Sequence, residues 1–361
     1  MLQFLNLQPE VFAIDINDFS LRIAKIQKRR KRFYLVSFNE VDIPQGIIKE
    51  GIIQDKDTLA NIITRACGSV KGKKLDTKYV IASLPEEKSF SQVIKLPKMT
   101  REELAGAVSF EIENYIPLTV DKVYFDFQEI PSAAKEANHT HVLINVMPKP
   151  IVDSYTACLK KAGLIPCVLE VESQANVRSL LKNAKESSNI IFLDLGKDTT
   201  TFVIYSGGSI KFSSSLPVSS EQITKAIADN LNISAGEAEN AKVKHGLGKD
   251  SEIIKAAGPI LRELVAQIEK YINFYQERFS SPPTDGLASS SAIEKIVLSG
   301  GGANLKKLPD FLSKELKIPV ELGNPLENIV PAKKSAQIPQ NKLLSFTTVL
   351  GLAIRAANHQ M

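Results

Sequence analysis

Two stretches of this chain, about 180 residues apart, follow the same pattern. Residues 11–16 and 190–196 are apolar runs in which an aspartate, Asp15 or Asp194, stands near the end. A turn, further strand-like segments and then helical segments follow each run, and short strands joined by tight turns indicate an antiparallel meander. A repeat of this length predicts an α/β fold made of two duplicated lobes that face a cleft.

The composition excludes several classes of protein. The 361 residues carry a net charge of only +5, below the clustered charge of a dedicated nucleic-acid binder, so we expect no nucleic-acid partner. No apolar run reaches the roughly 18 residues that span a bilayer, and the first residues lack the order of a signal peptide. The three cysteines lack metal or redox spacing, which fits a reducing compartment. We therefore expect a cytoplasmic protein that reaches a membrane only through partners.

A basic run at residues 28–32 lies between two predicted strands. Such a run can contact acidic lipid or nucleic acid. Five positive charges between two short strands are more often a solvated hairpin tip. We interpret the run as such a tip.

The first candidate site follows the strand that begins the second half. Asp194 is followed by Gly196, Thr199 and Thr200. Glycine permits a tight turn whose backbone N–H groups form a nest for phosphate oxygens, and the two threonines offer hydroxyl groups. An aspartate at a strand end can hold Mg²⁺ through water. An ordinary hairpin turn explains the same residues, and the motif alone does not decide between the two.

The corresponding turn of the first half is altered. Asp15 and Asn17 occupy the matching positions, and Asn17 can adopt the left-handed backbone that glycine favours. Asp18 adds a negative charge, and Phe19 is bulky for a phosphate loop. The turn either does the same work as its counterpart or has lost its phosphate contact.

A run of glycines is the clearest functional signal. Gly300, Gly301 and Gly302 follow a buried apolar strand, and Ala303 and Asn304 come next. Three glycines in a row let the backbone approach a planar ligand closely, and a helix that follows can point its N-terminus at that ligand. We interpret residues 299–304 as a ligand-binding loop.

Glu239 and Lys242 lie three residues apart in a predicted helix, so they share one face. They could bind a ribose, or they could form an exposed ion pair. The residues alone favour the ion pair.

Taken together, these segments resemble the actin-like ATPase superfamily, which includes FtsA. The resemblance implies that the two aspartate loops are phosphate loops, with Asp15 and Asp194 holding Mg²⁺ through water. It implies that residues 300–302 contact the adenosine of ATP or ADP, and that residues 238–246 contact ribose and adenine. Glu172 falls where bacterial actins carry a glutamate that orients the attacking water.

The middle of the chain narrows the resemblance to the PilM family. The resemblance rests on residues 110–118 (FEIENYIPL), Asp121 and residues 125–128 (FDFQ), then residues 171–173 (VES) and 351–355 (GLAIR). The family is a cytoplasmic component of type IV pili and of related type II secretion and competence systems. The resemblance covers almost the whole chain.

The resemblance implies a domain organisation. Residues 1–83 would form the first actin-like lobe, residues 84–169 an extra subdomain inserted in it, and residues 170–361 the second lobe. A groove beside the extra subdomain would hold the cytoplasmic N-terminal peptide of PilN, an inner-membrane protein. We expect its partner-binding residues to be Tyr115, Ile116, Pro117 and Leu118.

Bound nucleotide would act as a structural or switching ligand with little turnover, because the first loop lacks the usual glycine. The assembly could include rings or filaments of the chain itself. Two alternatives stay open: an FtsA-like filament protein tethered to membrane, and an active ATPase or kinase that uses Glu172. The apolar residues 343–357 look packed and not membrane-seeking, which disfavours the first alternative.

Overall fold

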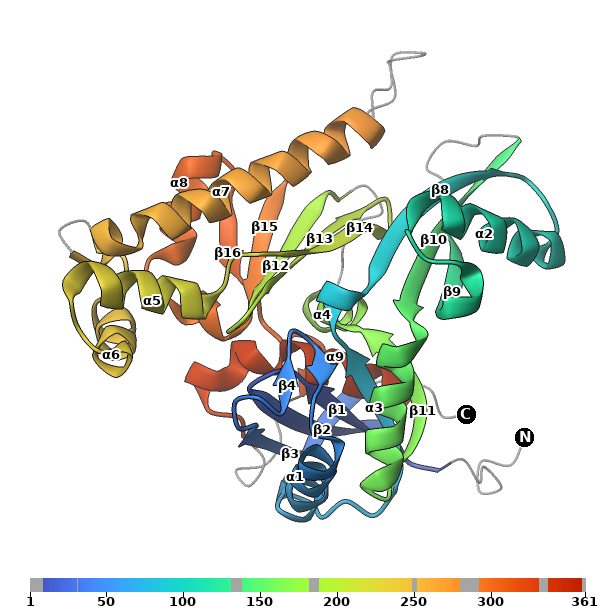
Figure 1. Ribbon diagram of the computed structural model, residues 1–361, viewed down its shortest axis with the longest axis horizontal. Coiled ribbons are helices and arrows are strands. Elements are labelled where there is room, and N and C mark those ends of the chain that lie inside the picture. Colours follow the sequence, from blue (N-terminus) through green and yellow to red (C-terminus); the bar gives the residue numbers. More distant parts are fainter. Residues whose placement is uncertain are drawn as a thin grey trace. The chain divides into compact units, whose positions relative to one another are not determined.

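The computed structural model describes residues 9–30, 32–130, 138–181, 188–248, 252–279, 292–330 and 337–358 (Figure 1). The chain forms two compact units. The first comprises Met1–Lys88, Pro148–Lys182 and Asn324–Met361, and the second comprises Ser89–Met147 and Asn183–Gly323. Among the described residues, none of the helices combines the length and the apolar character that a membrane span requires.

The first unit is a mixed sheet with helices on both faces. Its elements are β1 Phe12–Ile16, β2 Ser20–Arg29, β3 Arg32–Asp42, β4 Ile48–Lys49, β5 Ile52–Ile53, α1 Lys56–Gly68, β6 Lys71–Gly72, β7 Tyr79–Leu84, the 3-10 turn Glu86–Lys88, α3 Lys149–Lys161, β11 Ile165–Val171, α4 Glu172–Leu180, β17 Ile329–Val330, the 3-10 segment Gln340–Phe346 and α9 Thr347–Asn358.

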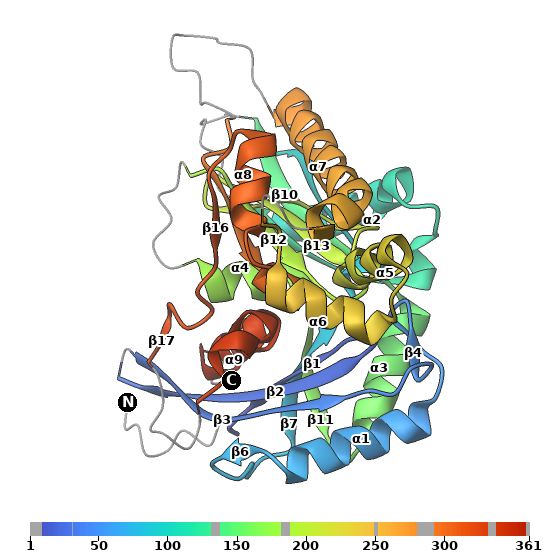
Figure 2. The same ribbon diagram turned by 90° about the vertical axis from the view of Figure 1, so that its left-hand side faces the viewer.

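The strands of this unit run in the order β11-β7-β1-β2-β3-β17. β1, β2 and β3 pair antiparallel, which confirms the predicted meander, and β7 and β11 add to β1 in parallel. Helix α9 lies on one side of the sheet and α1 on the other (Figure 2).

Helix α9 is the most buried helix of the first unit. Every residue from Thr347 to Ala357 except Arg355 is buried, and the helix packs on α4, β1 and β2. Glu170 at the end of β11 forms ion pairs with Arg178 of α4 and Arg355 of α9, at 2.5 and 3.0 Å. The expectation that this apolar segment packs inside the protein is confirmed.

The second unit contains a longer mixed sheet. Its elements are β8 Phe90–Pro97, α2 Arg101–Tyr115, the 3-10 turn Val120–Lys122, β9 Val123–Ile130, β10 His139–Pro148, β12 Ile190–Leu195, β13 Thr200–Ser206, β14 Ser209–Leu216, α5 Ser220–Leu231, α6 Ala235–His245, α7 Glu252–Phe279, β15 Lys295–Ser299, the 3-10 turn Gly301–Asn304, α8 Leu308–Leu316 and β16 Val320–Leu322.

The strand order of this sheet repeats that of the first unit. Strands β12, β13 and β14 pair antiparallel, and β15 and β16 add to β12 in parallel. The order β16-β15-β12-β13-β14 therefore matches β11-β7-β1-β2-β3 strand for strand. Asp15 and Asp194 occupy the same place in β1 and β12. This correspondence confirms the duplication predicted from the sequence.

Three further strands extend the second sheet. β8 pairs with β14 at Phe212 and Ser213, and β10 and β9 follow it. Helix α2 packs on these strands through Leu104, Val108 and Ile112, which recur every four residues and are all buried. Its N-terminus is capped, since Thr100 and Glu103 form a reciprocal capping box.

Helix α7 begins at Glu252 and carries Pro259 inside, although proline cannot donate to the carbonyl four residues earlier. The side chain of Asn230 on α5 donates to the Ala256 carbonyl in this stretch, at 3.3 Å. Helix α8 begins only at Leu308, because Lys307 before it has a left-handed backbone with a φ of 69°. Strand β11 and helix α4 were not predicted from the sequence.

Candidate functional site

The loop between β12 and β13 is a tight turn that packs on the start of α5. The Gly196 N–H donates to the Thr199 carbonyl at 2.9 Å, and a Cβ at Gly196 would lie 2.7 Å from that oxygen. The first two N–H groups of α5, from Ser220 and Glu221, donate to the Gly196 and Lys197 carbonyls at 3.0 Å. The start of α5 is therefore already satisfied by protein groups, and an anion at this loop must use the N–H groups of the loop itself.

The two threonines of this loop differ in what their hydroxyl groups can do. Thr200 is fully buried, and its hydroxyl donates to the Val218 carbonyl at 2.6 Å. Thr199 is half-buried. Of the two predicted phosphate ligands, Thr199 is the better placed to meet a ligand.

Asp194 and the glycine loop lie against each other at the ends of neighbouring parallel strands. β12 and β15 place Asp194 opposite Ser299, and the Ser299 hydroxyl donates to Asp194 Oδ2 at 2.7 Å. The sequence placed these two residues in separate motifs. The structure joins them into one edge of the sheet.

Close packing explains two of the three glycines. Gly300 has a φ of 83°, and a Cβ there would lie 2.4 Å from the Leu195 carbonyl oxygen and 2.7 Å from Asp194 Oδ1. A Cβ at Gly302 would lie 2.6 Å from Leu195 Cγ. Gly301 is exposed, and its carbonyl accepts from the Asn304 side chain at 3.1 Å. A ligand would thus meet Gly301 and Asn304, while Gly300 and Gly302 bring the loop against β12.

The predicted pair of Glu239 and Lys242, three residues apart on α6, belongs to a hydrogen-bond network with α5. Lys242 is 5% exposed, and its Nζ lies 2.7 Å from Glu239 Oε2 and 2.6 Å from Thr224 Oγ1. The Thr224 hydroxyl donates in turn to Glu239 at 2.6 Å. Partial burial acts to raise the pKa of Glu239, but the hydrogen bonds from Lys242 and Thr224 outweigh it and hold that pKa below its usual value. Lys242 therefore positions Glu239, whose carboxylate is half-exposed.

In the first unit, the altered loop after β1 is organised by Asn17. Its side-chain oxygen accepts from the Phe19 and Ser20 N–H groups and from the Ser20 hydroxyl, at 3.2, 2.9 and 3.0 Å. Asp18 points elsewhere and accepts from the N–H groups of Glu50 and Gly51, at 2.5 and 2.9 Å. Both polar side chains of the loop are thus used to hold backbone in place.

In the first unit, the environment of Asp15 favours a cation. The residue is 3% exposed, and its Oδ1 has no hydrogen-bond partner. Arg22 NH1 lies 3.6 Å from Oδ2. Burial raises the pKa of Asp15 despite the guanidinium. An unsatisfied buried acceptor fits a hydrated Mg²⁺ or another donor. Among the described residues no group of three or more His, Cys, Asp or Glu side chains could hold a metal, so such an ion would depend on water and phosphate oxygens.

Glu172 begins α4, where a negative charge is favourable, and it is half-buried. Tyr155, Glu87 and Glu172 interact electrostatically in the first unit. The Tyr155 hydroxyl donates to the Gly51 carbonyl at 3.2 Å, and burial, with Glu87 and Glu172, raises its pKa well above the usual value. The placement of Glu87 and Glu172 near Tyr155 was not predicted.

Glu87 makes the stability of the protein depend on pH. Burial, helped by the charge of Asp18, raises its pKa to about 7. The folded chain therefore binds this proton more tightly than the unfolded chain, and stability contributed by the protonated carboxyl is lost as pH rises from about 4.5 to 7. We expect Glu87→Gln to reduce the difference in unfolding free energy between pH 5 and pH 8 by roughly 2 kcal/mol. Urea unfolding at the two pH values measures this difference.

The control is Glu50→Gln, which removes an exposed carboxylate from the neighbouring turn. It should leave the pH difference unchanged. If Glu87→Gln leaves the difference in unfolding free energy between pH 5 and pH 8 unchanged, the raised pKa of Glu87 is contradicted.

The predicted partner-binding residues form the extended segment after α2. Tyr115 is 38% exposed and stacks on Phe90 with a centroid distance of 6.4 Å. Ile116 and Leu118 pack against the α2 core, while Pro117 is exposed. The sequence reading missed Phe110, which is 75% exposed. Helical periodicity could have found it, because it lies off the stripe of Leu104, Val108 and Ile112.

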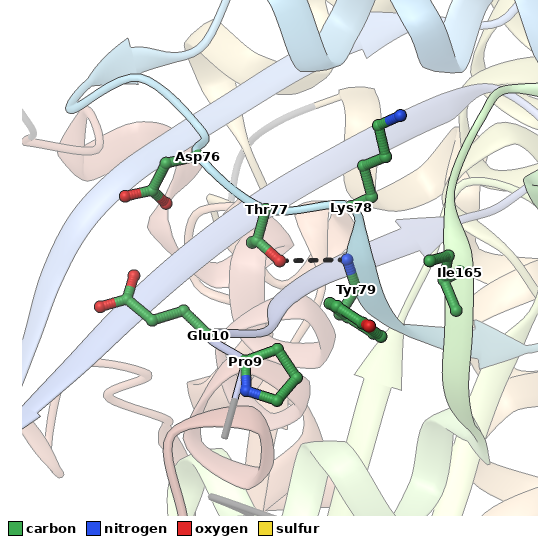
Figure 3. Close-up of a pocket in the computed structure, with 7 residues that line it drawn as sticks. All are labelled: Pro9, Glu10, Asp76, Thr77, Lys78, Tyr79 and Ile165. Atoms are coloured by element: carbon green, nitrogen blue, oxygen red, sulfur yellow. Dashed lines mark hydrogen bonds between the residues drawn. The ribbon is translucent and has the colours of Figure 1, made fainter. Parts of the chain in front are cut away.

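A separate pocket lies at the start of β7, lined by Pro9, Glu10, Asp76, Thr77, Lys78, Tyr79 and Ile165 (Figure 3). The carboxylates of Glu10 and Asp76 lie on the same side of it, and both form ion pairs with the buried Lys25. Lys25 offsets one of these two negative charges, and Lys73 Nζ lies 4.0 Å from Asp76 Oδ2. The pocket contains none of the predicted site residues.

Comparison with known proteins gives matches along almost the whole chain. The family model of the type IV pilus assembly protein PilM matches residues 13–357. The solved structure of a PilM-PilN type IV pilus biogenesis complex is similar with a TM-score of 0.82 and 25% identity, over 97% of this chain and 99% of that chain.

More distant relatives also match the chain. MreB5 of Spiroplasma citri bound to ADP is similar with a TM-score of 0.52 and 14% identity, over 98% of both chains. FtsA of Buchnera aphidicola is 27% identical over 206 residues, 49% of this chain and 47% of that protein. FtsA of Escherichia coli is 25% identical over 232 residues, 58% and 52% of the two chains. The chain spans about half the length of these curated relatives. The predicted actin-like ATPase fold is confirmed.

Proposed function

We propose, because the chain belongs to the family of the type IV pilus assembly protein PilM, that it is a cytoplasmic scaffold of pilus assembly that binds the N-terminal peptide of a PilN-like membrane protein. The observation that carries the proposal is the similarity to the PilM-PilN complex, which extends over 97% of this chain. The activity is thus binding, and no covalent step is required of the chain.

The surface proposed for the peptide is the end of α2 with the segment that follows. Ile116 has an extended backbone, with φ −125° and ψ 135°. Alternate residues of this segment face inward and outward, so Tyr115 and Pro117 remain at the surface while Ile116 and Leu118 are packed on the α2 core. Exposed aromatic side chains on a rigid element are frequent anchors of protein–peptide contacts. Phe110 and Tyr115 supply two of them.

Calorimetric titration of the full chain with a PilN-like N-terminal peptide tests this proposal. We expect 1:1 binding, and a loss of tenfold or more in affinity for Tyr115→Ala, because truncating an aromatic anchor removes about 1.4 kcal/mol or more. Tyr124→Ala is the matched control, since Tyr124 is 47% exposed but lies on β9. Absence of binding to the unmodified chain, with and without ATP, would refute the proposal.

We further propose that loops of the second unit bind ATP or ADP with Mg²⁺. The N–H groups of residues 197–199 and the Thr199 hydroxyl would meet phosphate, and the half-exposed Glu239 would accept from the ribose. Gly301 and Asn304 would lie along the base. Asp194, fixed by Ser299, is the proposed residue of this unit for hydrated Mg²⁺, which when bound neutralises phosphate charge. In the first unit, Asp15, with its unpartnered oxygen, is a separate proposed residue for hydrated Mg²⁺.

The proposal includes weak turnover at most. A glycine turn presents several backbone N–H groups to a phosphate, but in the first unit the Asn17 side chain already accepts from the loop's own donors. Glu172 is the proposed residue for orienting water if any hydrolysis occurs. A phosphate-release assay that showed fast turnover, lost in Glu172→Ala, would overturn this part of the proposal.

A further inference from the structure

The tip of the β2–β3 hairpin is built from exposed cations. Lys28, Arg29, Arg30 and Arg32 are all exposed, and Arg29 pairs directly with Arg32 across the strands. In the described part of the chain their partners are neutral. Lys28 donates to the Asn358 side chain at 2.7 Å, and Arg29 to that of Gln27 at 3.2 Å. The tip projects past α9 in Figure 2.

Two features of this tip work against folding. Arg30 has a φ of 57°, a left-handed conformation in which hairpin turns favour Asn or Gly. Arg29 and Arg32 place like charges directly opposite each other, which is unfavourable in a sheet. Arg29 also lies over the Tyr34 ring, but neither the left-handed Arg30 nor the like-charge pair improves the turn. A positive tip that costs stability twice points to a role outside folding.

A cavity lies beside the tip end of this hairpin. It has a volume of about 250 Å³, and its walls include Lys28 and Arg29 together with Ile26 and the Ala356–Ala357 end of α9. Glu10 also lines it, but its carboxylate lies 2.5 Å from the Nζ of Lys25. Two cations therefore border a small, partly apolar recess directly beside the tip.

We infer that this basic tip, with the recess beneath it, binds the anionic phospholipid headgroups of a membrane surface. Guanidinium groups match phosphate geometry and bind it through paired hydrogen bonds. Phe33 and Tyr34 follow Arg32 and are half-buried, and Lys28 and Arg29 lie over their rings at 5.6 and 5.9 Å. Aromatic rings beside cations are typical of the headgroup region. The contact would be additional to any membrane protein that the chain binds.

The arrangement favours a membrane over a nucleic acid. Single-stranded nucleic acid is bound along a charged groove in which aromatic rings are free to stack on bases. Here the cations are gathered at one turn, and the rings of Phe33 and Tyr34 are covered by Lys28 and Arg29. A single patch of positive charge fits a planar anionic surface better than it fits an extended nucleic-acid strand.

Co-sedimentation of the full chain with vesicles tests the inference. We expect binding to vesicles that contain phosphatidylglycerol, none to pure phosphatidylcholine, and a decrease with added salt. Each Lys or Arg near an anionic surface contributes about fivefold in binding, so Arg29→Gln/Arg30→Gln/Arg32→Gln should weaken it on the order of a hundredfold. Adding inorganic phosphate to the same vesicles distinguishes binding to a lipid surface from binding to free phosphate. Millimolar phosphate should not compete with the vesicles.

The charge-matched control is Lys225→Gln/Arg262→Gln/Lys314→Gln, in which three exposed cations of the second unit are removed. Both triple variants change the net charge from +5 to +2, a difference of three. Equal loss of vesicle binding in the two variants would overturn the inference, because it would show a non-specific charge effect. Tip-dependent binding to an RNA oligonucleotide without binding to anionic vesicles would also overturn it.

Arg30→Gly separates a binding role from a structural one. Glycine accepts the left-handed backbone, so we expect the melting temperature to rise, while vesicle binding falls about fivefold with the lost charge. A lower melting temperature with unchanged vesicle binding would show that Arg30 serves the fold, and the inference would fail.

Discussion

Gly300→Ala is expected to abolish nucleotide binding at the second unit and to destabilise the chain. The added Cβ would lie 2.4 Å from the Leu195 carbonyl oxygen, which belongs to β12 and cannot turn away as a side chain could. The substitution also forces alanine to a φ of 83°. Overpacking and left-handed strain together cost about 3 kcal/mol. The loop must therefore move away from β12 and from Asp194, whose Oδ1 would lie 2.7 Å from the added Cβ.

Calorimetric titration with ATP and Mg²⁺ measures the binding effect, and urea unfolding measures the stability. We expect affinity to fall at least a hundredfold. Gly208→Ala is the matched control, because Gly208 has a φ of 80° but no atom within 4 Å of an added Cβ. It should cost about 1 kcal/mol from backbone strain and leave affinity unchanged. ATP affinity that survives in Gly300→Ala would contradict the proposed site.

Gly351→Ala should disrupt the core of the first unit. Gly351 of α9 faces α4 so closely that a Cβ would lie 1.9 Å from the Ala175 carbonyl oxygen and 2.5 Å from its carbon. Both atoms are backbone, so the two helices must separate. Neighbouring contacts depend on that distance, among them the Thr348 hydroxyl that donates to Asn176 at 2.8 Å and Arg178 NH1 that donates to the Gly351 carbonyl at 3.3 Å.

We expect a loss of 3 kcal/mol or more, which is a large part of the roughly 5–15 kcal/mol that stabilises a typical protein. Thermal unfolding and the yield of folded protein measure it. Gly106→Ala in the middle of α2 is the control, since nothing lies within 4 Å of its added Cβ. It should gain about 0.5–1 kcal/mol from helix propensity. A Gly351→Ala protein as stable as the unmodified one would show that α4 and α9 do not pack as described.

The fold was predicted well wherever the signal was local. The apolar runs before Asp15 and Asp194 predicted β1 and β12. Each depends on residues within a few positions of one another. The PilM-family resemblance was also carried by short segments, and the match over residues 13–357 confirms it.

The missed elements depend on distant residues. Helix α4 is short and its sequence is polar on average, so its periodicity is weak. It is fixed by α9, more than 160 residues away, through Ala175 against Gly351 and through Arg178 beside Glu170. No pattern within α4 could predict these contacts. The same holds for Asp18, which was interpreted as a charge in a phosphate loop but binds the turn at Glu50 and Gly51.

The sequence by itself determined the duplicated architecture, the PilM family and the candidate ligand-binding loops, because strand periodicity and turn chemistry act over a few residues. Only the tertiary structure decided what each polar group does. It assigned Gly300 to packing on Leu195, the Thr200 hydroxyl to the Val218 carbonyl, and Lys242 to Glu239. A hydrogen bond or a close contact is set by which backbone segment lies opposite, and that is a property of the folded chain.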